Sequence, residues 1–335
     1  VPAEGKLQDP LWTGFVPSTE LPQIIDPPAG KIWTANNQIV PDDFPHLIAA
    51  DWPSSYRARR IGALLAHGAP FGPEDFIRMQ TDNHETGADD LLPILLAAPA
   101  EGKSEGQAHD LLATWDHDMG AGRPEPLIYS AWLDELQKLI LADDLGAMAP
   151  EVRWPREGFL QSALTPGDHS DWCDDQRTNA PETCTQLISR ALAAAIKTLS
   201  ARHGADIAKW RWDGAHHARH MHGVFGAIPL LSRLFNRELP VPGGDNTLNR
   251  QQMSHTGKQP LGAVHGAGYR AVYDLSDLKQ SRFITALGQS GNPFSAQYDD
   301  FMRKAASGET IQIPTAPEAF SSGALGTWTI SPEIH

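Results

Sequence analysis

The sequence has no long apolar run and comparatively little positive charge. No stretch reaches the roughly eighteen consecutive apolar residues that a membrane-spanning helix needs, so we expect no membrane span. Acidic residues outnumber basic residues by 41 to 27, and the formal net charge of -14 argues against nucleic acid or an anionic membrane as a partner. The opening residues Val1–Glu4 do not form a signal peptide, and we expect any targeting signal to lie upstream.

Cysteine is also scarce. The two cysteines, Cys173 and Cys184, flank a short acidic segment that contains proline and precedes a helical pattern. Their spacing alone leaves a disulfide and two free thiols both open. The length of 335 residues and the 41% of hydrophobic residues suffice for a sizeable core, in one large domain or two ordinary ones.

Two hydrolase motifs are missing. Ser290 lies in a Gly-Gln-Ser-Gly-Asn turn that departs from the Gly-x-Ser-x-Gly elbow of serine hydrolases. His216 and His220 are four residues apart, and on a helix they would share a face and offer zinc ligands, together with Asp213 or His217. The glutamate of the His-Glu-x-x-His metalloprotease pattern is absent. We favour structural hydrogen bonding for this cluster and keep a zinc-binding hydrolase as an alternative.

Apolar periodicity divides the chain into three parts. Residues 1–45 are proline-rich and predict extended chain and turns, with a short strand around Lys31–Thr34. Glycine-punctuated segments after Pro240 predict strands at Tyr269–Leu275 and Arg282–Leu287, and a last strand at Thr327–Ile330. Between these parts, helical spacing predicts helices that include Arg60–Leu65, Glu74–Gln80, Asp90–Leu96, His109–Trp115, Ile128–Leu145 and Thr185–Arg202.

A set of short segments resembles a known enzyme family. Gly30–Asn37 reads Gly-Lys-Ile-Trp-Thr-Ala-Asn-Asn, and Tyr56–Ile61 reads Tyr-Arg-Ala-Arg-Arg-Ile. Matching segments follow at Gly243–Asn249 and from Gly268 to Asp300. In order and spacing, from about Pro2 to about Thr310, the chain resembles the penicillin acylases, a family of N-terminal nucleophile hydrolases.

The resemblance implies an α+β fold with part of a four-layer αββα core. Residues 1–55 and 240–335 would contribute to that core, and residues 56–239 would form a mainly helical insertion. The whole of residues 1–335 would be the C-terminal part of the catalytic β subunit. Because penicillin acylases are mostly periplasmic or secreted, the resemblance also favours a disulfide between Cys173 and Cys184 and a periplasmic or secreted location.

The resemblance assigns roles to two residues. Asn36 falls on the asparagine that donates to the oxyanion, a task suited to a side-chain amide. Arg57 falls on an arginine close to the active centre that orients this asparagine or the N-terminal amine. In the family the first residue of the catalytic chain, mostly serine, is the nucleophile. Val1 has no hydroxyl or thiol, so the nucleophile would lie on another chain or a missing segment.

The implied reaction is hydrolysis of a secondary amide in a small N-acyl amine, such as a penicillin or an N-acyl homoserine lactone. Partners would be one or more companion chains that carry the α subunit and the nucleophile. No cofactor is needed for catalysis, while a structural calcium ion stays open because Asp42, Asp43 and Asp51 align poorly with the family's calcium ligand. A non-catalytic accessory fragment is the remaining alternative.

Overall fold

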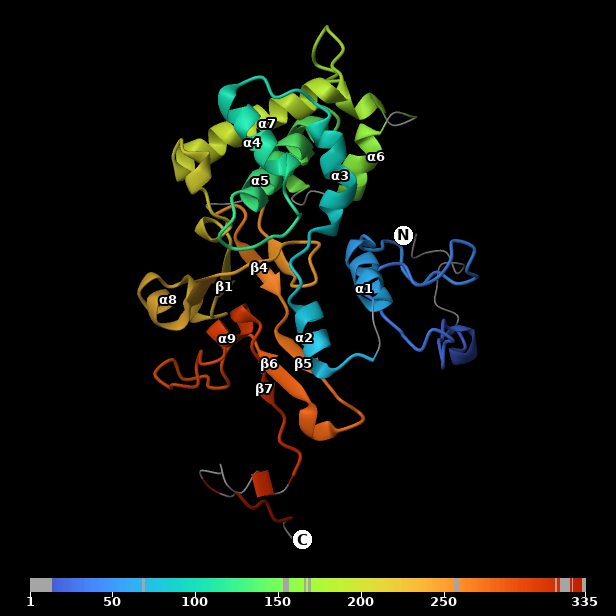
Figure 1. Ribbon diagram of the computed structural model, residues 1–335, viewed down its shortest axis with the longest axis vertical. Coiled ribbons are helices and arrows are strands. Elements are labelled where there is room, and N and C mark those ends of the chain that lie inside the picture. The colour runs from blue at the N-terminus through green and yellow to red at the C-terminus, as the bar shows by residue number, and fades with distance from the viewer. Residues whose placement is uncertain are drawn as a thin grey trace, which may run out of the picture. The chain divides into compact units, whose positions relative to one another are not determined.

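The computed structural model describes residues 14–67, 70–152, 157–165, 167, 170–255, 259–316, 318–319, 326 and 328–332. The chain divides into two compact units, Val1–Ala66 and His67–His335, and each is described by itself. The second unit combines helices with two sheets, which confirms the predicted α+β class (Figure 1). In the described part of the chain, no helix is long and apolar enough to cross a membrane.

In residues 14–66, the first unit is mostly irregular chain with one α-helix. A 3-10 turn spans Ser18–Glu20, and helix α1 spans Tyr56–Ala66. The predicted strand at Lys31–Thr34 is wrong: these residues belong to no strand in the structure. A strand needs a neighbouring strand to satisfy its backbone groups. This segment is tied to α1 instead, where the Lys31 ammonium group donates to the carbonyl oxygen of Leu65.

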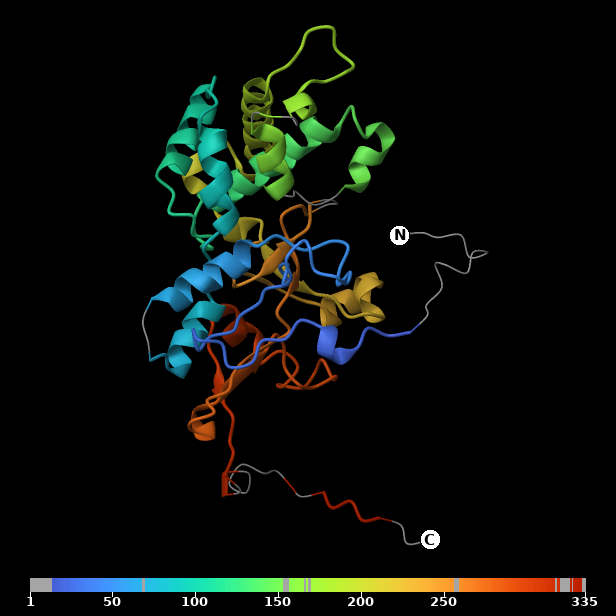
Figure 2. The ribbon, with the colours of Figure 1, turned by 90° about the vertical axis from the view of Figure 1, so that its right-hand side faces the viewer.

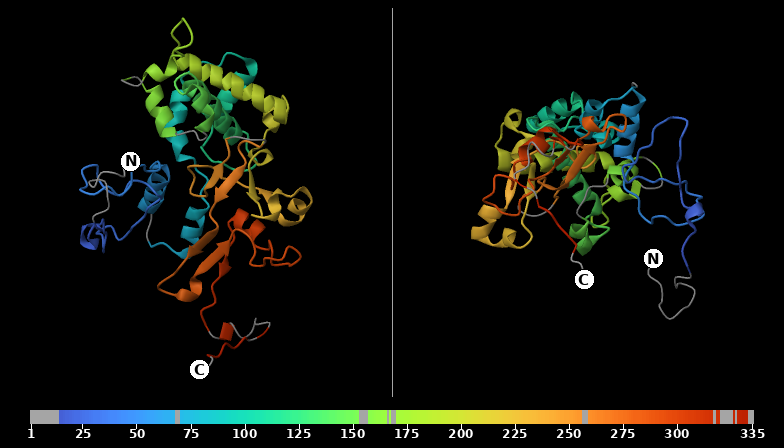
Figure 3. Two further views of the ribbon diagram at one scale, coloured as in Figure 1. Left: turned by 180° about the vertical axis from the view of Figure 1, so that it is seen from behind. Right: turned by 90° about the horizontal axis from the view of Figure 1, so that it is seen from below.

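Helices dominate the first two thirds of the second unit. They are α2 (Pro73–Gln80), α3 (Thr86–Leu96), α4 (Lys103–Ala113), α5 (Glu125–Leu141), α6 (Glu157–Leu164), α7 (Cys184–His203) and α8 (Pro229–Phe235). The predictions at Glu74–Gln80, Asp90–Leu96 and Thr185–Arg202 are thereby confirmed. Helices α3 to α7 gather at one end of the unit and both sheets lie towards the other (Figures 1, 2 and 3).

Helices α5 and α7 form the centre of the helical core. Most of α5 is buried, and the indole nitrogen of Trp132 donates to the carbonyl oxygen of Ile188 on α7 at 2.9 Å. Leu136, Ile140 and Leu192 pack in the same core. Burial of such side chains contributes about 1.5–3 kcal/mol each.

Local signals explain the limits of α7. Thr183 accepts from the backbone N–H of Gln186, whose side chain accepts in return from the N–H of Thr183, so the first turn has a capping box. Gly204 ends the helix with a φ of 87°, which glycine adopts without steric cost. The first residue of α7, Cys184, is bonded to Cys173, so the predicted disulfide is confirmed. By closing a short loop, this bridge contributes on the order of 2–3 kcal/mol.

Two sheets complete the second unit. The first has the order β2-β1-β4-β3, with β1 (His217–His220) antiparallel to β2 (Arg237–Pro240) and parallel to β4 (Ala263–Gly266). Strand β3 (Gln251–Met253) pairs with β4 in antiparallel fashion. The second sheet is antiparallel, with the order β5 (Tyr269–Val272), β6 (Arg282–Thr285) and β7 (Ile311–Gln312). Helix α9 (Met302–Ser307) precedes β7.

The strands after Pro240 are predicted correctly at two places and wrongly at one. Strands β5 and β6 lie within the predicted segments Tyr269–Leu275 and Arg282–Leu287. Of the last predicted strand, Thr327 lies outside the described residues. Residues 328–330 form no strand, and the Trp328 side chain is exposed. A strand needs a neighbouring strand to satisfy its backbone groups.

Candidate active site

Asn36 and Arg57 lie side by side in the first unit. Arg57 is the second residue of α1, and its Nη2 donates to the carbonyl oxygen of Ala35 at 2.9 Å and to Oδ1 of Asn36 at 3.1 Å. One guanidinium nitrogen therefore holds both the backbone and the side chain of the loop that carries the asparagine.

This contact sets the orientation of the Asn36 amide. A guanidinium group offers only donors, so the atom that faces it is the amide oxygen. The NH2 group consequently points away from Arg57, and within residues 14–67 it donates to no acceptor. The exposed side chain of Asn36 thus presents two N–H donors outward.

The backbone of Asn36 adopts a φ of 67°, in the left-handed region. Asparagine occupies this region more readily than most residues, and such conformations concentrate at ligand-binding and catalytic positions. Neighbouring contacts hold the loop in place. Ala35 is buried and its N–H donates to Oδ1 of Asn37 at 3.2 Å, while the Trp33 ring lies against Gly62 on α1.

A structural calcium ion at Asp42, Asp43 or Asp51 stays a prediction. Oδ1 of Asp42 accepts from the Gln38 side chain at 2.8 Å. Across the described residues, the one grouping of metal-ligand side chains is elsewhere and contains neither Asp42 nor Asp43.

The zinc alternative at His216 and His220 is wrong. The histidines are not on a helix: His220 ends strand β1, and His216 precedes that strand. In extended chain, residues four apart are separated by about 13 Å, too far to share an ion whose ligands lie about 2 Å away. His216 is buried, stacks on Trp212 and donates from Nδ1 to the Leu261 carbonyl oxygen at 2.6 Å. Burial lowers its pKa to about 4, which leaves the ring neutral.

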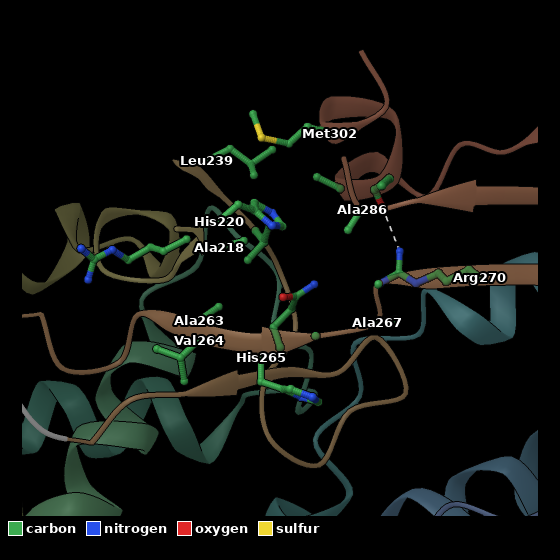
Figure 4. Close-up of a pocket in the computed structure, with 17 residues that line it drawn as sticks. Ala218, His220, Leu239, Ala263, Val264, His265, Ala267, Arg270, Ala286 and Met302 are labelled. Atoms are coloured by element: carbon green, nitrogen blue, oxygen red, sulfur yellow. Dashed lines mark hydrogen bonds between the residues drawn. The ribbon is translucent and has the colours of Figure 1, made fainter. Parts of the chain in front are cut away.

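His220 lines a cavity of about 260 Å³ between the two sheets (Figure 4). The walls are largely small apolar side chains, including Ala218, Ala263 and Met302. Arg270 also lines the cavity and donates to the carbonyl oxygen of Ala305 at 2.9 Å. His216 therefore makes a buried hydrogen bond, whereas His220 lines a cavity.

A buried group of ionisable side chains escaped prediction from the sequence. Glu85 at the start of α3 and Glu157 at the start of α6 are both buried, and with Asp245 and His255 they line a cavity of about 10 Å³. Such a volume holds about one water molecule. His255 bonds to Asp134 at 2.6 Å and to Asp245 at 3.2 Å. This group ties the helical core to the Gly243–Asn249 segment, so its contacts indicate a structural role.

Comparison with known proteins shows to which family the chain belongs. The penicillin amidase family model matches residues 1–322. The chain belongs to the penicillin amidase family. It is 27% identical over 318 residues to penicillin acylase 2 proenzyme of Pseudomonas sp. (strain SE83), with 90% of this chain and 38% of that protein covered. It is 28% identical to the acyl-homoserine lactone acylase QuiP of Pseudomonas syringae pv. syringae (strain B728a), with 93% and 40% covered.

A solved structure supports the same family at the level of the fold. The thermostable penicillin G acylase from Alcaligenes faecalis matches with a TM-score of 0.60 and 15% identity, over 92% of this chain and 58% of that one. The likeness shows an N-terminal nucleophile hydrolase fold. The chain spans about two fifths of the length of the acylases it matches in sequence.

Proposed function

We propose that this chain supplies the oxyanion-binding part of an amidase that removes an acyl group from a small N-acyl amine. The observation that supports the proposal is the contact between Arg57 and the Asn36 oxygen. This contact leaves the amide NH2 group directed away from Arg57 and able to donate to a substrate oxygen. The names of the matched acylases favour a penicillin-type β-lactam or an N-acyl homoserine lactone as substrate. Asn36 would be a catalytic residue and Arg57 a positioning residue.

The proposed mechanism uses a nucleophile on a companion chain or segment outside residues 1–335. A serine at the start of a companion chain or segment would attack the amide carbonyl carbon, and its own α-amine, with an ordinary pKa near 8, would accept the hydroxyl proton. The carbonyl oxygen then becomes negative and accepts hydrogen bonds from Asn36 and a backbone N–H. The proton passes to the leaving amine, and water hydrolyses the acyl-enzyme.

The expected contribution of Asn36 to kcat can be taken from oxyanion donors in other enzymes. Removing one oxyanion donor costs about 2.7–4 kcal/mol, or roughly 10²–10³ in kcat. An amide held in place by Arg57 needs little reorganisation when charge develops, which is the condition under which such a donor is effective.

We also propose a periplasmic or secreted location. The disulfide between Cys173 and Cys184 supports it, because disulfides persist in oxidising compartments.

The direct test of the nucleophile is denaturing intact-mass analysis with N-terminal sequencing of the native purified protein. We expect a companion chain or segment that begins with Ser, Thr or Cys, and hydrolysis of chromogenic acyl amides by the intact assembly. If this chain purifies alone and the amides are not cleaved, the proposed mechanism is wrong.

A further inference from the structure

A second group of side chains in the second unit has the composition of a metal site. His84, Asp89 and His117 each offer a ligand atom, and these atoms all lie within 4.8 Å of one another. We propose that this group binds a divalent transition-metal ion such as Zn²⁺, independently of the proposed amidase activity.

The backbone fixes the three ligands from separate segments. Residues 83–85 run antiparallel to residues 117–119, with the N–H of Glu85 donating to the His117 carbonyl oxygen at 2.8 Å and the N–H of Met119 donating to that of Asn83 at 3.0 Å. This pairing places the imidazoles of His84 and His117 next to each other, with ring centres 5.7 Å apart. Asp89 projects from the first turn of α3 onto both rings.

The distances from the two imidazoles to Asp89 are close to those around a small ion, and the two imidazole nitrogens lie within 4.8 Å of each other. In a tetrahedral zinc site with ligands about 2.0–2.2 Å from the ion, neighbouring ligand atoms are roughly 3.3 Å apart. Nε2 of His84 is 3.0 Å and 3.1 Å from the two carboxylate oxygens of Asp89. Nδ1 of His117 is 2.5 Å from Oδ1, so this edge would widen by less than 1 Å.

Ligand chemistry and exposure narrow the class of ion. Two imidazole nitrogens with one carboxylate suit Zn²⁺, Co²⁺, Ni²⁺ or Cu²⁺, whereas Ca²⁺ and Mg²⁺ prefer oxygen ligands throughout. The side chains of His84 and His117 are 23% and 22% exposed, and that of Asp89 is 40% exposed. An ion can therefore enter from solvent and keep water in a remaining coordination position.

The backbone at His117 adopts an unusual conformation. Its φ is 62°, a left-handed conformation that costs free energy for a residue with a side chain. Its ring also packs edge-on against Trp115, with ring centres 5.3 Å apart. Asp89 bridges the two histidines by hydrogen bonds, so metal binding would replace an existing set of polar contacts.

The test uses the purified protein that contains this chain, stripped with a chelator and titrated with Co²⁺ and Zn²⁺. We expect one Co²⁺ per chain with the visible absorption of a site that includes nitrogen ligands, displacement by Zn²⁺, and a Zn²⁺-dependent rise in the thermal midpoint. His84→Ala and His117→Ala should each weaken Zn²⁺ affinity at least about tenfold, since even changes behind the ligands cost 10–100-fold. His265→Ala, which removes an exposed histidine elsewhere in the same unit, should leave affinity unchanged.

Asp89→Asn serves if the histidine variants fail to fold, because it keeps the side-chain shape and replaces only the charged ligand. We expect it to weaken Zn²⁺ binding while the far-ultraviolet circular dichroism stays the same. Binding of equal affinity in Asp89→Asn and the unmodified protein would overturn the proposal. So would the absence of saturable Co²⁺ or Zn²⁺ binding by the unmodified protein.

Discussion

Arg57 reaches back 21 residues along the chain to donate to Oδ1 of Asn36 at 3.1 Å. The same nitrogen donates to the carbonyl oxygen of Ala35, so the side chain and backbone of the loop are held from one point. The amide NH2 of Asn36 is thereby directed outward. This relationship is the physical basis for assigning a positioning role to Arg57.

Replacing Arg57 should slow turnover more than it weakens substrate binding. Arg57→Ala removes both hydrogen bonds from Nη2 to the Asn36 loop. Hydrogen bonds from charged groups contribute about 1.5–3 kcal/mol, so we expect kcat to fall roughly 10- to 100-fold with KM changed less. Arg57→Lys should recover part of the loss, because an ammonium group can also donate to these oxygens but lacks the fixed planar geometry of the guanidinium group. Steady-state kinetics on a chromogenic acyl amide measure both parameters.

Arg59→Ala is the matched control for this experiment. Arg59 lies on the same helix two residues away, with its guanidinium over the Tyr56 ring at 5.1 Å. We expect kcat within about twofold of the unmodified enzyme. The positioning role is wrong if Arg57→Ala behaves like Arg59→Ala.

Gly243 should tolerate no side chain. Its φ is 92°, and an added Cβ would lie 2.1 Å from the carbonyl oxygen of Asn249. Gly243→Ala should therefore lower the free energy of unfolding by about 2–4 kcal/mol, through backbone strain and displacement of the loop. Gly106→Ala is the control, because Gly106 lies within α4 with nothing within 4 Å of the added atom, and alanine there should stabilise by about 0.5–1 kcal/mol. Urea unfolding curves separate the two; equal stability of both variants would contradict the prediction.

The stability of the second unit should fall as pH rises. Burial, reinforced by the negative charge of Glu157, raises the pKa of Glu85 to about 8. Burial and the charge of Asp245 raise the pKa of Glu157 to about 7. Between the ordinary value of 4.5 and these values, the folded state binds more protons than the unfolded state, so stability decreases with pH. We expect the free energy of unfolding to be lower at pH 9 than at pH 5 by several kcal/mol.

His255 also makes the folded state less stable as pH rises. Burial alone would lower its pKa, but hydrogen bonds to Asp134 and Asp245 outweigh burial and raise the pKa to about 10. Its stabilisation is complete below about pH 6.5 and is lost as pH rises through about 10.

Glu85→Gln isolates the carboxyl contribution, because glutamine stays neutral at every pH. Its unfolding free energy should change less between pH 5 and pH 9 than that of the unmodified protein, while Glu101→Gln, at an exposed position, should leave the pH dependence intact. Denaturant midpoints at pH 5, 7 and 9 give the comparison. An unmodified protein that is more stable at pH 9 than at pH 5 would refute this account of the buried acids.

The sequence allowed some features to be predicted because their causes are local. The periodicity of Thr185–Arg202 and the glycine at position 204 determine helix α7 and its end, and the structure agrees. The segment at Lys31–Thr34 has local strand character, but whether it becomes a strand depends on a partner elsewhere in the chain. Cysteine spacing likewise left pairing open until the fold placed Cys173 next to Cys184.

The groups missed from the sequence come from distant segments. Glu85 and Asn246 are 161 residues apart, yet the N–H of Asn246 donates to Glu85 at 3.4 Å. His84 and His117 lie on different loops and meet only because two backbone segments pair. No spacing rule links such residues. Asn36 and Arg57 were found through a family resemblance, and the structure adds the contact between them; their catalytic roles stay predictions.

The most direct measurement is kcat for Asn36→Ala beside Asn37→Ala, in the intact processed protein. Asn37 is the matched control because its Oδ1 accepts from the Ala35 N–H and its NH2 group donates to the Gln38 carbonyl oxygen. The account predicts a loss of at least about 100-fold in kcat for Asn36→Ala and a much smaller loss for Asn37→Ala. The circular dichroism spectrum of Asn36→Ala should match that of the unmodified protein. Equal kcat in Asn36→Ala and the unmodified protein would contradict the role of Asn36 as oxyanion donor.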